Sequence, residues 1–178
     1  MASLTQRMTG AMQADVKTFQ EIEADPTALG QAVAVIVIAS VASLIGNMFR
    51  IGLSHGVMTL IANLVGYALW TLLVVLIGTK LMPEPTTKAD FNEAFRVIGF
   101  SASPGVVNVL AIIPFLGVLI SFVVWIWMVV VGVVAVREVL DYSSTARAVI
   151  VCLIAAVICW IVSFVVLLPL MVGSALMS

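Results

Sequence analysis

The chain has 178 residues, of which 63% are hydrophobic and 10% charged, with a mean hydropathy of +1.25 and a formal net charge of −1 at pH 7. Water-soluble domains carry about 25% charged residues, so this composition excludes a soluble domain. The near-neutral charge argues against nucleic acid as a partner, because binding nucleic acid requires a basic face.

Four stretches lack Lys, Arg, Asp and Glu: residues 26–49, 51–79, 97–136 and 148–178. An apolar helix needs about 20 residues to cross the hydrocarbon core of a bilayer. Three of the stretches hold one crossing each, and 97–136 is long enough for two. We therefore predict an all-α integral membrane protein, a bundle of five transmembrane helices near residues 27–48, 55–77, 91–113, 118–136 and 146–171. Residues 1–25 form a separate N-terminal segment.

The N-terminal segment has the pattern of an amphipathic helix over residues 1–24. Its apolar residues, among them Leu4, Met8, Val16 and Phe19, recur at helical spacings, and its charged residues mostly fall on the other face. Such a helix lies in the membrane interface or docks on a partner. The alternative is a frayed, partly ordered tail.

The first two predicted spans each carry a polar stripe. Asp25-Pro26 is typical of a helix start, and a weakly polar face follows it in the first span. In the second span, Asn63, Tyr67 and Thr71 are four residues apart and therefore share a face. This stripe lines a pathway across the membrane or hydrogen-bonds to a neighbouring helix, and the second interpretation is favoured because such polar stripes usually mark helix packing in lipid.

Proline and glycine interrupt the long third stretch at two places. Pro104-Gly105 predicts a kink or a break, because proline removes a backbone donor and glycine lowers helix stability further. Pro114 and Gly117 predict a tight hairpin, because an unbroken helix over 97–136 would be about 60 Å long, twice the thickness of the hydrocarbon core. Spans three and four are then antiparallel neighbours.

Charged residues gather in the connections between spans. Arg137 and Asp141 are spaced for an i, i+4 pair. Arg96, Arg137, Glu138 and Asp141 are the candidate ion-pair cluster at the cytoplasmic ends of spans three and four, with Arg96 expected to pair with Glu138 or Asp141 as a structural clamp.

Cytoplasmic connections carry an excess of Lys and Arg, and this fixes the expected topology. With five spans, the N-terminus and the connections near 80–96 and 137–147 share one side, which holds every basic residue except Arg50 and all nine acidic residues. We therefore expect the N-terminus in the cytoplasm and the C-terminus outside. The short connections between the spans favour a bacterial inner membrane.

No catalytic, cofactor-binding or metal-binding site is predicted. The chain lacks a GxxxxGK[ST] loop, an HExxH pair and a C-x-x-C pair. Cys152 and Cys159 lie two helical turns apart, too far for a disulfide, and read as packing residues. His55, the only histidine, has no neighbouring group to complete a catalytic site, so an enzyme is not expected.

The central block from Ala94 to Pro104, the segment Ile112–Gly117, and the runs Val124–Trp127 and Gly132–Arg137 resemble the Yip1 domain family, and so do Asp15–Ile22 and Ser143–Ala148. The resemblance, closest to prokaryotic members, implies five spans with a cytoplasmic N-terminus. Eukaryotic members are implicated in binding small prenylated GTPases and in shaping membranes, and their cytoplasmic N-terminal region is longer than residues 1–25 here.

Two functions are consistent with these features. The favoured one is a non-enzymatic membrane scaffold, adaptor or membrane-organising protein, since no ionisable residue lies at mid-membrane depth. The other is a small oligomeric transporter or channel that uses the Asn63/Tyr67/Thr71 stripe and the Pro104-Gly105 break. The expected partners are the lipid bilayer and either other membrane proteins or further copies of this chain, with no cofactor.

Overall fold

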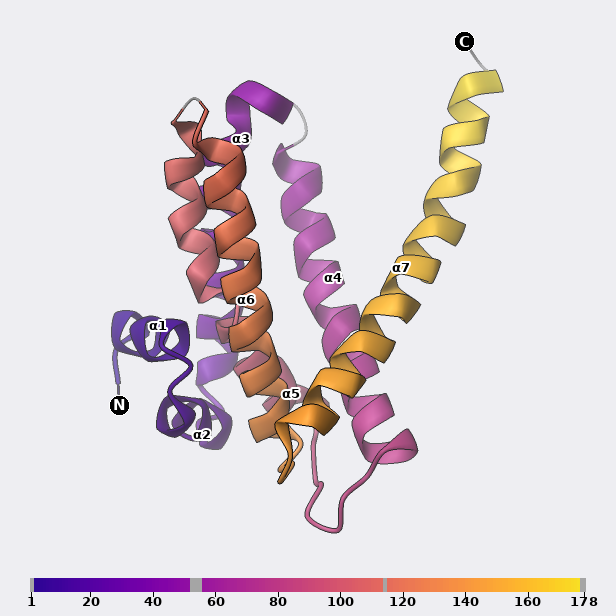
Figure 1. Cartoon of the computed structure of the whole chain (residues 1–178). Helices are drawn as coiled ribbons and strands as arrows, with labels where there is room; N and C mark the ends of the chain where they lie inside the picture. Colours follow the sequence, from indigo (N-terminus) through magenta and orange to yellow (C-terminus); the bar gives the residue numbers. More distant parts are fainter. Residues whose placement is uncertain (1, 52–55, 114, 177–178) are drawn as a thin grey trace.

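The computed structural model describes residues 2–51, 56–113 and 115–176, and these residues form helices without strands. In chain order the elements are α1 (Leu4–Met12), α2 (Val16–Ala24), α3 (Ala28–Ile51), α4 (Gly56–Leu76), the π-helix η2 (Ile77–Leu81), α5 (Phe91–Phe100), the 3-10 helix η3 (Ser103–Ile112), α6 (Gly117–Val139) and α7 (Thr145–Leu176). Figure 1 shows the long helices side by side as an upright bundle.

Five segments of the described chain are long and apolar enough to cross a membrane, which confirms the predicted helical class. They are Ala28–Met48, Met58–Leu81, Phe91–Ile112, Gly117–Val139 and Thr145–Val162. The N-terminal helices and the connections at 82–90 and 140–144 lie at one end of the bundle, and the C-terminus lies at the other end (Figure 1). The charged residues of the predicted cytoplasmic side are therefore on one side of the bundle.

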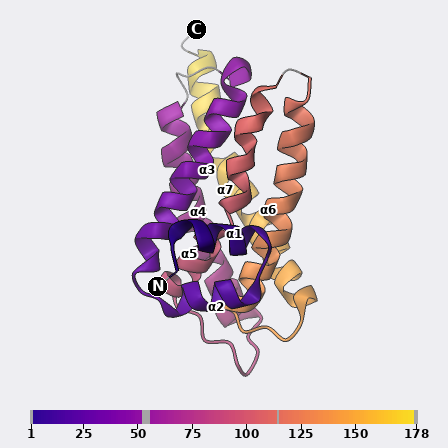
Figure 2. The same ribbon diagram turned by 90° about the vertical axis from the view of Figure 1, so that its left-hand side faces the viewer.

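The N-terminal segment forms two helices where the sequence pattern predicted one. Ala14 has a φ of 53°, a left-handed conformation that ends α1, and Asp15 then caps α2 by accepting a hydrogen bond from the backbone N–H of Thr18. Figure 2 shows α1 and α2 crossing the face of the bundle. Phe19 and Ile22 are fully buried. The apolar face of the segment therefore packs on the bundle of its own chain.

The third span breaks, as the Pro104-Gly105 pair predicted. α5 ends at Phe100, and after a turn at Ser101-Ala102 the chain continues as the 3-10 helix η3. The hydroxyls of Ser101 and Ser103 donate to the backbone oxygens of Ile98 and Phe100, both at 2.6 Å, and so stabilise the carbonyls at the break.

The second half of this broken span packs unusually close to α3. A side-chain carbon added at Gly46 of α3 would overlap the backbone oxygen of Asn108 in η3, and one added at Gly105 would come within 3.0 Å of Ala39. Small residues therefore hold α3 and η3 together, as they commonly do between helices in lipid.

A tight turn joins η3 to α6, at the place where the sequence predicted a hairpin. Pro114 lies outside the described residues. Phe115 has a φ of 67°, and the backbone N–H of Gly117 donates to the oxygen of Ile113 at 3.0 Å. At Gly117 an added side-chain carbon would overlap the oxygen of Ala111, so the turn requires glycine there.

Candidate intramembrane groove and cytoplasmic face

A groove of about 620 Å³ lies between α4, α6 and α7 and is open at the bundle surface, where Trp125, Val129 and Leu153 of its lining are exposed. It exists because the broken α5–η3 span packs on α3 and α6, whereas α7 diverges from α4 toward the C-terminus (Figure 1). Its lining consists of Ala62, Asn63, Gly66, Tyr67, Trp70, Ser101, Trp125, Met128, Val129, Gly132, Val133, Val149, Cys152, Leu153, Ala156 and Cys159. The volume falls in the range of about 300–1,000 Å³ that is usual for ligand pockets.

The walls of the groove are apolar, and many of the lining side chains are small. Ala62 and Gly66 occupy successive turns of α4, and Cys152, Ala156 and Cys159 follow one another along α7. A side-chain carbon at Gly66 would meet nothing within 4 Å, and one at Gly132 would meet only the Ser101 hydroxyl, at 4.0 Å. The groove therefore has open space beside the backbone of two of its helices.

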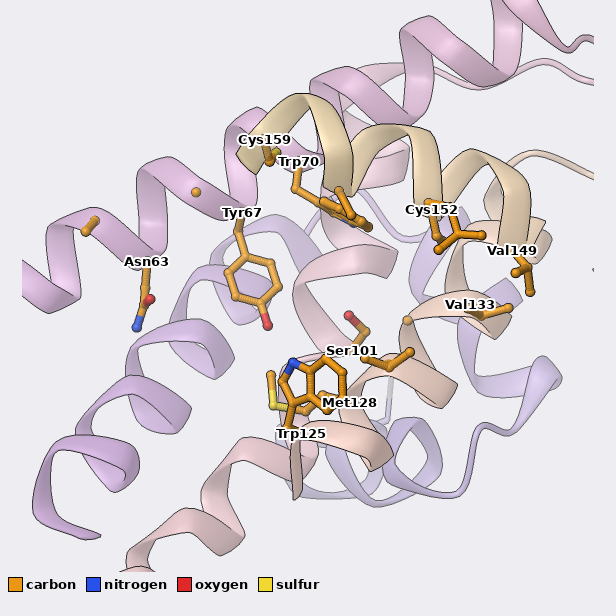
Figure 3. Close-up of a pocket in the computed structure, with 16 residues that line it drawn as sticks. Asn63, Tyr67, Trp70, Ser101, Trp125, Met128, Val133, Val149, Cys152 and Cys159 are labelled. Atoms are coloured by element: carbon orange, nitrogen blue, oxygen red, sulfur yellow. The ribbon is translucent and has the colours of Figure 1, made fainter. Parts of the chain in front are cut away.

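Two members of the predicted polar stripe on α4 line the groove, and the third is buried. Asn63 lines the groove, and its amide donates to the Ser40 hydroxyl of α3 at 2.9 Å, so this member also binds a neighbouring helix. Thr71 is fully buried and donates to the backbone oxygen of Tyr67 at 2.8 Å. The Tyr67 hydroxyl points into the groove, toward Met128 and Trp125 on α6 (Figure 3).

The predicted ion-pair cluster lies at the other candidate site, the end of the bundle that carries α1 and α2. Arg137, Glu138 and Asp141 line a polar pocket of about 670 Å³ that also includes Lys88 of the 82–90 connection. Arg137 donates to the backbone oxygen of Tyr142 at 3.3 Å. α6 ends at Val139, and Asp141 follows in a left-handed turn with a φ of 51°, so Arg137 and Asp141 no longer share a helical face.

Arg96 stands beside these acids, but its guanidinium donates to the backbone oxygen of Glu23 at 2.6 Å. It therefore caps the end of α2 and links α5 to the N-terminal segment. The ion pairs of the described chain involve Arg7 with Glu21 and Asp25, and Arg147 with Glu84. Docking of α2 explains the difference from the expected clamp, because it brings an unpaired helix-end carbonyl to Arg96.

Three other carboxylates act on Glu23, whose backbone oxygen accepts the Arg96 hydrogen bond. Burial of Glu23, followed by repulsion from Asp141, Glu93 and Glu138, raises the pKa of Glu23 to about 7, although Arg96 opposes the shift. Glu23 is half-buried. Near neutral pH this part of the surface therefore exchanges a proton with solvent.

Arg7 anchors the N-terminal helices, although the sequence pattern predicted no role for this residue. Its side chain is buried and donates to Asp25 at 2.6 Å, to Glu21 at 3.1 Å and to Gln31 of α3 at 3.0 Å. Burial alone would lower the pKa of Arg7, but the hydrogen bonds to Asp25 and Glu21 outweigh it and raise the pKa. The residue therefore stays charged while buried.

Two further side chains hold the end of the bundle that carries α1 and α2 by hydrogen bonds. The Trp127 indole of α6 donates to the backbone oxygen of Met12 at 2.8 Å. Tyr142 is buried, and its hydroxyl donates to the oxygens of Met82 at 2.8 Å and Gly78 at 3.3 Å. These contacts fix α1 against α6, and they fix the 140–144 connection against η2 and the start of the 82–90 connection.

The described residues hold no group of three or more His, Cys, Asp or Glu side chains that could bind a metal ion. Cys152 and Cys159 are free thiols on α7. His55 lies outside the described residues.

Comparison with known proteins agrees with the resemblance noted in the sequence. The family model of the Yip1 domain matches residues 10–176. The chain belongs to the Yip1 domain family. No curated protein and no solved structure matches it. The match begins inside α1 and ends inside α7, so this Yip1 domain includes most of the N-terminal segment as well as the five apolar spans.

The residues of this Yip1 domain that sequence reasoning missed are those whose partners are distant in the chain. Arg7 and Gln31 are separated by 24 positions, and Trp127 and Met12 by 115. The first contact could have been suspected from the sequence, because Gln31 both donates and accepts hydrogen bonds and lies near the start of a largely apolar span. No local pattern identifies the second.

Proposed function

We propose that this Yip1 domain protein is a non-enzymatic membrane scaffold or adaptor that holds a transmembrane helix of another membrane protein in the groove between α4, α6 and α7. The groove carries the proposal, because it lies between apolar spans, is open at the exposed Val129 and Leu153, and has no charged side chain in its lining. Groups that enter it therefore come from within the bilayer.

Small residues favour a helix as the occupant of the groove. Association of helices in lipid depends on close packing, and interfaces between them are enriched in Gly, Ala and Ser. Ala62 and Gly66 on α4, Gly132 on α6 and Ala156 on α7 provide this surface on three sides. A fluid acyl chain does not need a row of small residues, because it adapts to larger side chains.

The proposal is tested by photo-crosslinking in native membranes. A photoreactive residue replaces Val129, which lines the groove, or Val130, its neighbour outside the groove; the two are 46% and 54% exposed. We expect a discrete protein adduct from position 129 only. The adduct should disappear in Gly132→Leu and Gly66→Leu, which fill the groove.

Gly30→Leu is the matched control, because Gly30 of α3 lies outside the groove lining and also has open space around it. This variant should keep the adduct. Identical adducts from positions 129 and 130, or an adduct that survives both groove-filling variants, would refute the scaffold proposal.

The alternative function is a small transporter, and the Tyr67 hydroxyl in the groove together with the break in the third span favours it. Flux into vesicles that is lost on replacing Asn63 by Leu and Tyr67 by Phe would support transport. Flux that these changes leave intact would remove the groove as its route.

We also propose that the N-terminus is cytoplasmic and that the membrane is a bacterial inner membrane. The excess of basic residues at the end of the bundle that carries α1 and α2 supports this orientation. The test is a reporter fused at Ser178. Activity of a reporter type that works only outside the cytoplasm would agree with this orientation, and activity of a reporter type that works only in the cytoplasm would contradict it.

A further inference from the structure

We infer that the helix bound in the groove carries a hydrogen-bond acceptor side chain, such as Asn, Gln, Ser or Thr, at mid-membrane depth, level with Tyr67. This inference rests on the proposed function, since it names the chemistry of the partner for the same groove. It starts from the side chain of Tyr67, whose surroundings are apolar.

The Tyr67 hydroxyl is a donor without a partner in the described part of the chain. It lies well inside the candidate span Met58–Leu81, and its phenol points into the groove (Figure 3). Hydrocarbon offers no acceptor, so an unpaired hydroxyl at this depth costs free energy. Buried tyrosines usually find a hydrogen-bond partner, and this one would find it in an occupant of the groove.

The Asn63 and Ser101 side chains in the groove lining use their donors elsewhere, and no hydrogen bond in the described chain joins the Tyr67 hydroxyl to either of their oxygens. The amide of Asn63 donates to Ser40, and the hydroxyl of Ser101 donates to the oxygen of Ile98. Trp125 stands across the groove from Tyr67 (Figure 3), and its indole N–H likewise has no partner among the residues that the structure describes. The indole N–H can only donate, and the phenol also has a proton to donate, so an acceptor on the occupant would serve both groups.

A lipid tail does not provide this acceptor. The hydrocarbon core is about 30 Å thick, and the ester and phosphate oxygens of lipids lie outside it. An acyl chain would fill the groove beside Leu153 and Val129 but would leave the Tyr67 hydroxyl unpaired.

A second copy of this chain does not supply the acceptor from its exposed faces either. The exposed large side chains of α6 are apolar or, in Trp125, a donor: Val118, Leu119, Phe122, Val123, Trp125, Ile126, Val129 and Val130. On α3, α4 and the part of α7 whose side chains are described, the exposed side chains at mid-membrane depth are likewise apolar or donors, and the exposed Thr59 of α4 lies at one end of its span. The partner is therefore a helix with a different sequence.

The test uses the full chain in phosphatidylcholine vesicles and two synthetic transmembrane helices. Both are Leu/Ala helices with lysine ends, and they differ only in a central Asn or a central Leu. Energy transfer between a dye on the protein and a dye on the peptide measures binding, at peptide densities where the Asn peptide shows no transfer to itself. We expect the Asn helix to bind about three- to twentyfold more tightly, the range for one hydrogen bond between helices in lipid.

Variants separate the hydrogen bond from the groove. Tyr67→Phe keeps the ring and should remove the preference for Asn, so that both helices bind equally. Gly132→Leu and Gly66→Leu should weaken both helices, whereas Gly30→Leu should weaken neither. Agreement of the two groove-filling variants with each other shows that the loss comes from the groove and not from misfolding of one variant.

Each contrary outcome has a distinct meaning. The acceptor inference is overturned if both helices bind the unmodified protein equally, or if the preference for Asn survives Tyr67→Phe. The scaffold proposal still stands in that case, provided that groove filling weakens the binding of both helices. Binding insensitive to groove filling overturns both proposals. Two last outcomes would assign the groove to another occupant and overturn both proposals. One is energy transfer between two labelled copies of the protein, and the other is retention of a co-purified lipid. Either counts only if groove filling abolishes it and neither peptide binds.

Discussion

Replacing Arg7 by methionine should release α1 and α2 from the bundle. The Arg7 side chain is only 1% exposed and connects three partners: Asp25 at 2.6 Å, Glu21 at 3.1 Å and Gln31 at 3.0 Å. Methionine keeps much of the volume and removes the charge and the donors. The change therefore tests the polar contacts of the residue separately from its packing.

The expected cost follows from the exposure of each partner. A hydrogen bond to a charged group contributes about 1.5–3 kcal/mol when buried. Asp25 is 17% exposed and fits that range, whereas Glu21 is 48% exposed and its pair contributes only about 0.2–1 kcal/mol. Asp25 is not left unpaired, because Thr27 still donates to it, and the change also removes the unpaired buried Nε of Arg7. We therefore expect a net loss of about 2–3 kcal/mol.

Hydrogen exchange in lipid nanodiscs measures this loss directly. Local opening free energies set the exchange rates, so the amides of α1 and α2 should exchange roughly 30- to 100-fold faster in Arg7→Met, with α3 to α6 unchanged. Lys17→Met, on the exposed side of α2, is the control and should change nothing. Unchanged protection of α1 and α2 would refute the role of Arg7 as their anchor.

The same docking should depend on pH through Asp25. Hydrogen bonds from Thr27 and Arg7 lower the pKa of Asp25 from its ordinary 3.8 to about 2. A carboxyl with a lowered pKa contributes its stabilisation above the ordinary value and loses it as the pH falls through the folded value. In Glu23→Gln, which removes the α2 carboxyl that titrates near pH 7, protection of α1 and α2 should therefore stay constant from pH 7 to about 4 and decline between about 4 and 2. A decline that begins near pH 6 would contradict this assignment.

Three other changes test the packing and the charge of the bundle. Gly46→Ala should destabilise the protein by about 2–4 kcal/mol in a denaturant titration, because its methyl group would overlap the oxygen of Asn108. Gly30→Ala is the control and should not destabilise the protein. Equal effects of the two changes would refute the close α3–η3 contact. Tyr142→Phe should cost about 1–2 kcal/mol and speed exchange in the 77–90 segment, because it removes a buried hydroxyl that binds two carbonyls; unchanged exchange would show that the hydroxyl does not fix this connection. The pKa of Glu23 is raised from 4.5 to about 7, so the destabilisation by Glu23 builds up between pH 4.5 and about 7 and is complete above 7. Glu23→Gln should therefore stabilise by about 1 kcal/mol at pH 8, after discounting for solvent exposure, and by almost nothing at pH 4, and an equal gain at both would disprove the shift.

The class of fold was predictable because it depends on composition along the chain. Lys80, Arg96 and Arg137 bound apolar stretches of the right length to cross a bilayer, and no tertiary contact changes that count. The break at Pro104 was equally predictable, because the missing donor and the steric clash of proline are local properties.

The structure of the N-terminal segment was only partly predictable from its sequence. Its helical period was visible, but the turn at Ala14 was not, since alanine has no preference for a left-handed backbone. The partner of the apolar face was also hidden. A face of Phe19 and Ile22 packs equally well on lipid, on another protein or on its own bundle, and only the folded chain selects among these.

The helical membrane class, the five spans, the broken third span and the charges at one end all follow from the chain alone. That Arg96 binds the end of α2, and that the Tyr67 hydroxyl stays unpaired among the described residues of the groove while Asn63 and Thr71 form hydrogen bonds, depends on how the helices pack. The physical reason is that spacing along one helix fixes which side chains share a face, whereas the partner of that face depends on how separate helices pack. That packing is set by close contacts between distant small residues such as Gly46 and by the divergence of α7.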